Sequence, residues 1–332
     1  FIAVLASYLK NKSSFNEKRI IKPFFIILAI QLVLGTIQYN SPSDSYINRY
    51  ADNSQEQTDE DMYGPDDTEQ AIATVGNAVR VTGTFSYLGG YTALVSFFWL
   101  FTFYLTKAKS VNYLFVLSPL IIYTSLISGA RASVGFSLIL LAFFIFIEKK
   151  LIIKKTQSIL IYSMAIVLLI SSYMILGDRL GLVGQVESAY ENFIYRFESS
   201  KEESEGRLTR DLISVFNRDF EYKYTGVGLG ATYQGANALF GTSEIVKSTP
   251  MEGELFRIVV EGGILLIIIR WLILLALLSN LELPKSLKIL FFIIFGIFSP
   301  TVFHMYNAVY ISIGIICLNQ AYLKLYNNAK TI

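Results

Sequence analysis

The sequence predicts an all-α polytopic membrane protein: about eight complete transmembrane helices, a partial one at the N-terminus, and a large extracytoplasmic loop containing amphipathic helices. Of the 332 residues, 53% are hydrophobic and 16% are charged, and the mean hydropathy is +0.48. An average soluble domain carries about 25% charged residues. The apolar residues fall into blocks of about 18–25 residues, the length that crosses a bilayer core.

This composition excludes several classes of protein. A cytosolic globular enzyme, a disordered chain or a secreted disulfide scaffold would not carry such apolar blocks. An outer-membrane barrel would alternate polar and apolar residues over strands of about ten residues. Cys317, the only cysteine, lies in an apolar run, so neither a disulfide framework nor a thiolate metal site is expected. No group of His, Cys, Asp and Glu has metal-ligand spacing, and we expect no metal and no other cofactor.

The apolar blocks predict the spans in chain order. Residues 1–9 match the tail of a span, so we expect a fragment whose upstream spans are missing. Complete spans are expected at about 20–38, 87–106, 112–129, 131–147, 157–176, 254–278, 287–302 and 304–321. The whole chain, 1–332, is expected to be a single integral membrane domain. Its first outer loop covers 39–86, and its large outer loop covers 177–253.

The distribution of Lys and Arg predicts the orientation of these spans. One side carries 15 basic residues against three acidic ones, and the two long loops on the other side have an acidic excess. Basic residues accumulate on the cytoplasmic side of membrane proteins. Both long loops are therefore predicted to face out.

Two arginines lie at predicted span ends on the outer side. Arg80 opens the stretch Arg80-Val81-Thr82-Gly83-Thr84-Phe85, and Arg131 follows Ser128-Gly129-Ala130 at a short outer turn. A guanidinium placed there offers a planar fork of donors that suits phosphate oxygens. The alternative is that each arginine only anchors a helix end at the lipid headgroups.

The large outer loop contains two predicted amphipathic helices, because apolar residues recur at helical spacing over 190–197 and 208–220. On the second helix, Arg207 and Arg210 belong to the neighbouring polar stripe. Such a helix would lie on the membrane with its apolar face down and both arginines directed into a cleft. The alternative is an ordinary solvated face.

Alternating glycines follow in Thr225-Gly226-Val227-Gly228-Leu229-Gly230. This is not the dinucleotide-binding fingerprint, because no βαβ unit surrounds it and the spacing differs. The glycines can build a backbone nest for an anion or a tight turn, and the turn is the favoured interpretation.

The loop re-enters the membrane through a charged helix start. Glu254, Arg257 and Glu261 are spaced i, i+3 and i+7, so they share one face of the predicted helix. Charge at a hydrocarbon boundary is costly and indicates function, although an internally paired cluster is the structural alternative. His304, the only histidine, lies at the outer end of the last hairpin. Arg270 lies about four turns further along the re-entry helix, where it can snorkel to the cytoplasm, and receives no role.

Together these segments resemble the O-antigen polymerase and O-antigen ligase superfamily, which includes the Wzy-type polysaccharide repeat-unit polymerases. The resemblance runs from about Arg80 to the C-terminus and rests on the order of the motifs. An Arg-x-x-Gly-Thr-Phe precedes one span, and a Ser-Gly-x-Arg begins another. A large outer loop then contains Gly206-Arg207 and the glycine run, and the next span continues from Glu254-Leu255 through Glu261-Gly262-Gly263.

One departure from the superfamily pattern separates its two activities. Ligases usually carry His-Asn where the large loop re-enters the membrane, whereas this chain has Met251, Glu252 and Glu254 there. The difference favours a polymerase over a ligase. A flippase or other transporter is the non-enzymatic alternative. Transporters often show internal repeats and midplane polar sites, but this sequence has no repeat and its charges gather at one face.

The resemblance implies a metal-independent glycosyltransferase of the bacterial cytoplasmic (inner) membrane, multi-pass, with its active site on the extracytoplasmic side. It would transfer a glycan from undecaprenyl diphosphate to a lipid-linked acceptor, extending O-antigen, capsule or exopolysaccharide. The implied partners are undecaprenyl-diphosphate-linked oligosaccharide, membrane lipid, a flippase and a chain-length regulator, with no nucleic acid.

Stabilising the diphosphate requires cations, and activating the acceptor requires a base. The expected diphosphate-binding residues are Arg131, Arg207 and Arg210, with Arg80 and Arg257 in support. The expected base is Glu254, followed by Glu252 and His304.

Overall fold

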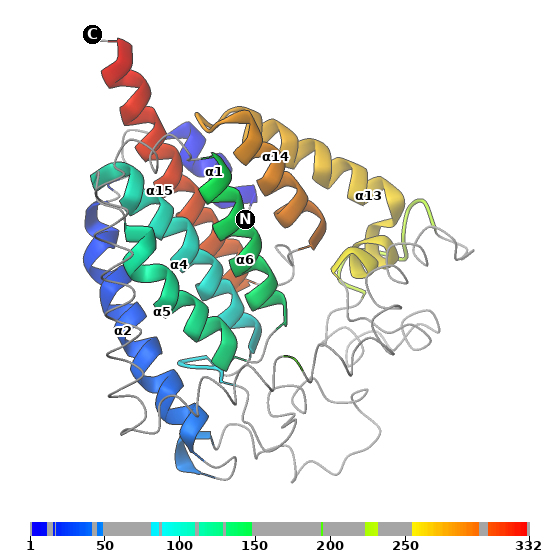
Figure 1. Cartoon of the computed structure of the whole chain (residues 1–332). Coiled ribbons are helices and arrows are strands. Elements are labelled where there is room, and N and C mark those ends of the chain that lie inside the picture. The colour runs from blue at the N-terminus through cyan, green and yellow to red at the C-terminus, as the bar shows by residue number, and fades with distance from the viewer. Residues whose placement is uncertain are drawn as a thin grey trace, which may run out of the picture. The chain divides into compact units, whose positions relative to one another are not determined.

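The computed structural model in Figure 1 describes residues 2–11, 16, 18–41, 45–48, 81–85, 88–109, 113–128, 131–147, 194, 223–231, 254–298 and 305–330. The elements are the helices α1 (Ile2–Lys10), α2 (Lys18–Asn40), α4 (Leu88–Lys109), α5 (Tyr113–Ile127), α6 (Arg131–Ile147), α13 (Glu254–Ser279), α14 (Lys285–Ile293), the π-helix η3 (Ile294–Phe298) and α15 (Met305–Lys330). Every regular element within these ranges is a helix, which confirms the predicted all-α class for the described part of the chain.

A helix lies over each predicted apolar block that the structure describes. The block predicted at 157–176 and most of both predicted outer loops lie outside the described residues. Among the described residues, three helices are long and apolar enough to cross a membrane, namely Lys18–Asn40, Arg257–Ser279 and Ala308–Leu325. The chain therefore has the helices of a membrane protein, and the number of complete spans stays a prediction.

The described residues group into two compact units. One contains 1–15 and 198–312, and the other contains 16–197 and 313–332. In the second unit, α4 packs against α5 and α6, and α2 packs against α5 (Figure 1). Residues 93–106 of α4 are all buried, so this helix is the core of the unit. In the first unit, α13 packs against α1 and against α14 with its η3 continuation.

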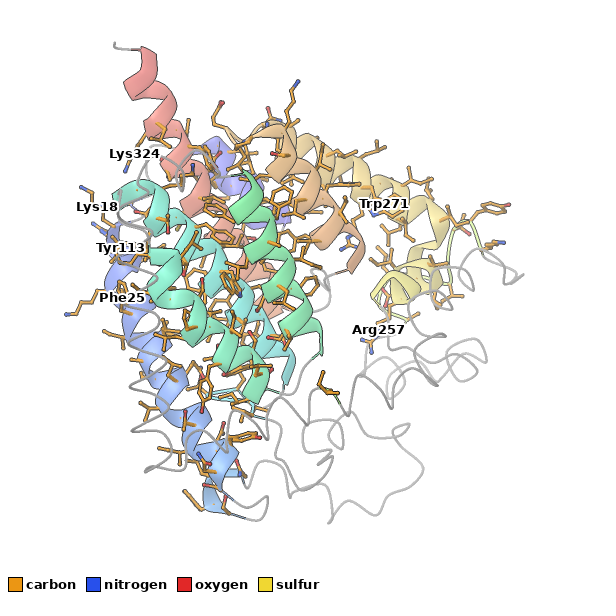
Figure 2. The ribbon with its side chains drawn as sticks, viewed as in Figure 1. Lys18, Phe25, Tyr113, Arg257, Trp271 and Lys324 are labelled. Carbon is orange, nitrogen blue, oxygen red and sulfur yellow. The ribbon has the colours of Figure 1, made fainter. Side chains whose placement is uncertain are left out.

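In the middle of helix α2, apolar side chains are exposed and polar side chains are buried, as in a membrane helix. Within residues 24–38 its exposed large side chains are apolar: Phe25, Ile26, Ile30, Val33 and Ile37. Figure 2 labels Phe25 on this surface. The polar side chains of Gln31 and Gln38 are instead buried, with 1% and 5% of their area exposed. A helix in lipid places apolar side chains outward and hydrogen-bonds its polar ones inside the bundle. The pattern supports a membrane environment for this unit.

A small hydroxyl network ties the core helix to its neighbours. The indole Nε1 of Trp99 on α4 donates to Ser137 Oγ on α6 at 2.7 Å. That oxygen lies 2.8 Å from Ser125 Oγ on α5. Trp99 is fully buried, so the indole N–H needs this acceptor. The network therefore links three helices at one point.

Replacing Ser137 by Ala should lower the stability of the protein by about 1–3 kcal/mol, because the buried indole of Trp99 loses its acceptor. Thermal unfolding in detergent, followed by loss of near-ultraviolet circular dichroism, measures the change. Gly135→Ala on the same helix is the control. A Cβ at Gly135 meets open space, so that variant should be as stable as wild type or more so. Equal stability of Ser137→Ala and wild type would contradict the role assigned to the network.

Candidate functional site

The structure describes some of the predicted site residues, and the others lie outside the described ranges. Arg80, Arg207, Arg210, Glu252 and His304 lie outside the described residues. Arg131 is the first residue of α6, and Glu254 is the first residue of α13, as the predicted span starts require. Arg257 follows one turn into α13, and Figure 2 shows its side chain. The structure describes in detail two segments that carry predicted motifs: residues 81–85, which follow Arg80, and the glycine run with helix α13.

The turn that directly follows Arg80 is clamped by two glutamines. Phe85 N donates to Thr82 O at 3.1 Å, which closes a β-turn around Gly83. Gln38 pairs with both backbone groups of Gly83: its Oε1 accepts from Gly83 N at 2.9 Å, and its Nε2 donates to Gly83 O at 3.2 Å. Gly83 has φ +61°, a conformation that favours glycine at this turn position. Gln38 thus recognises the turn by its backbone.

Gln31 extends the clamp to the next residue. Its Oε1 accepts from Thr84 N at 3.3 Å, and its Nε2 donates to the Thr84 hydroxyl at 2.5 Å. Gln31 and Gln38 are seven residues apart on α2 and therefore lie on one face. The sequence interpretation missed both residues, although two amides at this spacing inside an apolar block were a usable signal. The clamp therefore fixes Gly83 and Thr84, two residues of the motif that begins with Arg80.

Helix α13 is broken shortly after it begins. Gly263 has φ 65° and ψ −172°, which lies in a backbone region that essentially only glycine adopts. The break separates a short half-helix, Glu254–Gly262, from the long half, Ile264–Ser279 (Figure 1). The short half carries Arg257 and Glu261.

The glycine run docks into this break. Val227 N donates to Val260 O at 2.8 Å, and Gly228 N donates to Glu261 O at 3.0 Å. In the opposite direction, Ile264 N donates to Lys223 O at 3.1 Å, and Leu265 N donates to Tyr224 O at 3.2 Å. We call the segment Lys223–Gly228 the splint turn. Of the two interpretations left open for the glycine run, the turn is confirmed. The N–H groups of Val227 and Gly228 serve helix carbonyls, so they are not directed at an anion.

Two glycines make this docking possible. Gly226 has φ +73°, and a Cβ there would overlap the carbonyl of Glu261. A Cβ on Gly263 would overlap the carbonyl of Tyr224. The backbones therefore approach as closely as only glycine allows.

Glu261 is a buried carboxylate beside the break. Only 5% of its area is exposed, and Arg257 lies one turn before it on the same half-helix. Burying a carboxylate in an apolar segment is costly, which marks the residue as a candidate for function. The sequence interpretation placed Glu261 on this face but gave it no role.

Arg270, which the sequence leaves free to snorkel, is instead buried against a neighbouring helix. It is 7% exposed, and its Nη2 donates to Phe295 O at 3.2 Å. The next residue, Trp271, donates from Nε1 to Gly296 O at 3.0 Å. Both acceptors belong to η3, whose last carbonyls have no partner within the helix. Arg270 therefore satisfies the end of a neighbouring helix instead of reaching for the headgroups.

No family model, no curated protein and no solved structure matches this chain. The resemblance to the O-antigen superfamily therefore rests on the order of the motifs named above, and it enters the functional argument as a proposal.

Replacing Gln38 by Leu should release the turn at Gly83, because both backbone groups of that glycine lose their partner. The reporter is a cysteine at Val81, which is fully buried in the clamped turn. We expect maleimide labelling of Val81→Cys to become at least about tenfold faster with Gln38→Leu, since an unsatisfied buried group costs about 1–3 kcal/mol. Asn40→Ala is the matched control on the same helix, because that amide bonds only its own helix at Thr36 O among the described contacts. Equal labelling in all three proteins would refute the clamp.

Proposed function

We propose that this protein is a polysaccharide repeat-unit polymerase of the bacterial cytoplasmic membrane, acting on undecaprenyl-diphosphate-linked glycans at the outer face. The observation that carries the proposal is the order of motifs from Arg80 to Gly263. Its structural support is local: the turn after Arg80 and the splint turn are each tied to a long apolar helix by four hydrogen bonds. Fixed segments of this kind suit residues that must be preorganised around a charged substrate.

The proposed reaction transfers the glycan between two lipid-linked molecules. An acceptor hydroxyl gives its proton to a carboxylate and attacks the anomeric carbon of the donor glycan. The bond from that carbon to the diphosphate oxygen breaks, and undecaprenyl diphosphate leaves with the electron pair. In this proposal Glu254 accepts the proton, with Glu252 and His304 as the other candidates.

The arginines stabilise the leaving group. Negative charge builds on the diphosphate as the bond breaks, and a guanidinium in a water-poor site stabilises that charge more strongly than it does in water. We assign this role to Arg131, Arg207 and Arg210, supported by Arg80 and Arg257. The chemistry then needs neither a nucleotide nor a metal.

The orientation is open to a labelling test. Cysteines at Ser54 and Ser199 should react with an impermeant maleimide in intact cells, or in spheroplasts if an outer membrane is present. A cysteine at Thr156 should react only after the membrane is broken. Cys317 is fully buried and gives little background. The reverse pattern would place the loops in the cytoplasm and contradict the proposal.

The arginine assignment predicts a defect in chain extension. In membranes supplied with an undecaprenyl-diphosphate-linked repeat unit, Arg131→Ala and Arg257→Ala should each reduce polymer by at least about a hundredfold at unchanged protein level. Replacement by Lys should restore little, because a point charge lacks the bidentate fork. Arg218→Ala is the control and should make wild-type polymer, because Arg218 belongs to the same predicted helix as Arg210 but has no assigned role. Transfer of a single repeat unit to another acceptor without extension would identify a ligase instead.

The base assignment predicts the effect of Glu254→Gln. The amide keeps the size of the side chain but cannot accept the proton, so polymerisation should slow by roughly 10²–10⁴ while the protein still folds. If Glu254 only neutralised Arg257, removing both charges together would restore activity, because the two residues would be coupled. Full polymer from Glu254→Gln would eliminate it as the base and shift the role to Glu252 or His304.

A further inference from the structure

We infer that the splint turn and the break at Gly263 form a two-state element, in which α13 is either broken with the turn docked or continuous with the turn released. The docked form is the one that holds the short half-helix Glu254–Gly262 in its working direction. Only this last statement rests on the proposed function. The two states themselves rest on the hydrogen bonds.

The four bonds made by the splint turn use the same helix groups that would form two bonds in an unbroken helix. In a continuous α-helix each N–H donates to the carbonyl four residues earlier. Ile264 N would then donate to Val260 O, and Leu265 N would donate to Glu261 O. These are the four groups that bond the splint turn. Each of these four groups therefore has a partner in either form.

The turn is attached to the helix mainly by its backbone. Tyr224 is 72% exposed and Leu229 is 77% exposed, so these two side chains gain little from docking, and Val227 is half-buried. A hydrogen bond exchanged with water changes an equilibrium constant by only about two- to tenfold. On release the helix regains two bonds of its own. The docked and released forms are therefore close enough in free energy for the turn to come off.

Gly263 is compatible with both forms, because glycine adopts helical torsions as well as the observed ones. An alanine would strongly favour the continuous helix, since its Cβ excludes the broken conformation. Gly226 differs, because a Cβ there blocks docking but leaves the helix unconstrained. The two glycines thus act as positioning residues for the half-helix that carries Arg257 and Glu261.

A disulfide between Tyr224→Cys and Leu265→Cys reports docking. Leu265 N donates to Tyr224 O at 3.2 Å, and both side chains are exposed. Backbones joined in this way lie within the Cα separation that a disulfide spans. The full chain, with Cys317→Ala, is oxidised in native membranes, and the crosslink is scored by the mobility shift of a fragment pair after cleavage at a site introduced between the two cysteines.

Crosslinking should be efficient in the otherwise wild-type chain and at least about tenfold slower with Gly226→Ala or Gly263→Ala. Gly230→Ala is the matched control: it also replaces a glycine of positive φ, but its Cβ meets open space and it lies outside the splint turn. That variant should crosslink normally. Unchanged crosslinking in Gly263→Ala would show that docking and the break are independent, and would overturn the inference.

The positioning role is tested by polymer synthesis. Gly226→Ala and Gly263→Ala should each lose synthesis, because neither variant reaches the docked form. The oxidised disulfide in the otherwise wild-type chain should leave synthesis intact, because it holds the turn docked. Full synthesis by undocked Gly226→Ala would overturn the positioning role. If the wild-type chain makes no polymer at all, the proposed function fails, while the crosslinking result still decides whether the two states exist.

Discussion

The requirement that buried backbone groups be hydrogen-bonded governs the irregular parts of this molecule. An apolar surrounding offers no water to replace a lost partner, so a helix can break only where another segment takes over its N–H and C=O groups. At Gly263 the splint turn supplies two donors and two acceptors for the two donors and two acceptors that the break exposes. The break and the turn are therefore one structural unit, although more than thirty residues separate them in the sequence.

The same constraint explains the other two irregular sites in the described part of the chain. The turn at Gly83 is satisfied by the side-chain amides of Gln31 and Gln38, which imitate a backbone partner. The end of η3 is satisfied by Arg270 and its neighbour Trp271. In each case, polar side chains that would be costly inside an apolar bundle are retained because the backbone needs them. The first site fixes the turn of the motif that begins with Arg80, and the second joins η3 to the re-entry helix α13.

The positions of the helices could be predicted from the sequence because a span requires an apolar block of fixed length. The contacts inside the bundle could not. The spacing of Gln31 and Gln38 marks one polar face of α2, but it does not reveal that the turn at Gly83 is the segment which meets that face. Arg270 has the same reach whether it snorkels or turns inward, and only the position of η3 decides between them. The sequence predicts one unbroken span over 254–278, because the pair Gly262-Gly263 is as compatible with a straight helix as with a break until its partner turn is known.

Hydrogen exchange at the amides of Val227, Gly228, Ile264 and Leu265 tests the central claim most directly, with the protein in lipid nanodiscs. In the wild-type chain all four amides should be protected, since each donates across the break. In Gly263→Ala, Val227 and Gly228 should exchange at least about a hundredfold faster, whereas Ile264 and Leu265 stay protected by the closed helix. Loss of protection at all four amides would mean that the substitution only damages the helix. Continued protection of Val227 and Gly228 would mean that the turn docks without the break, and either result would contradict the account.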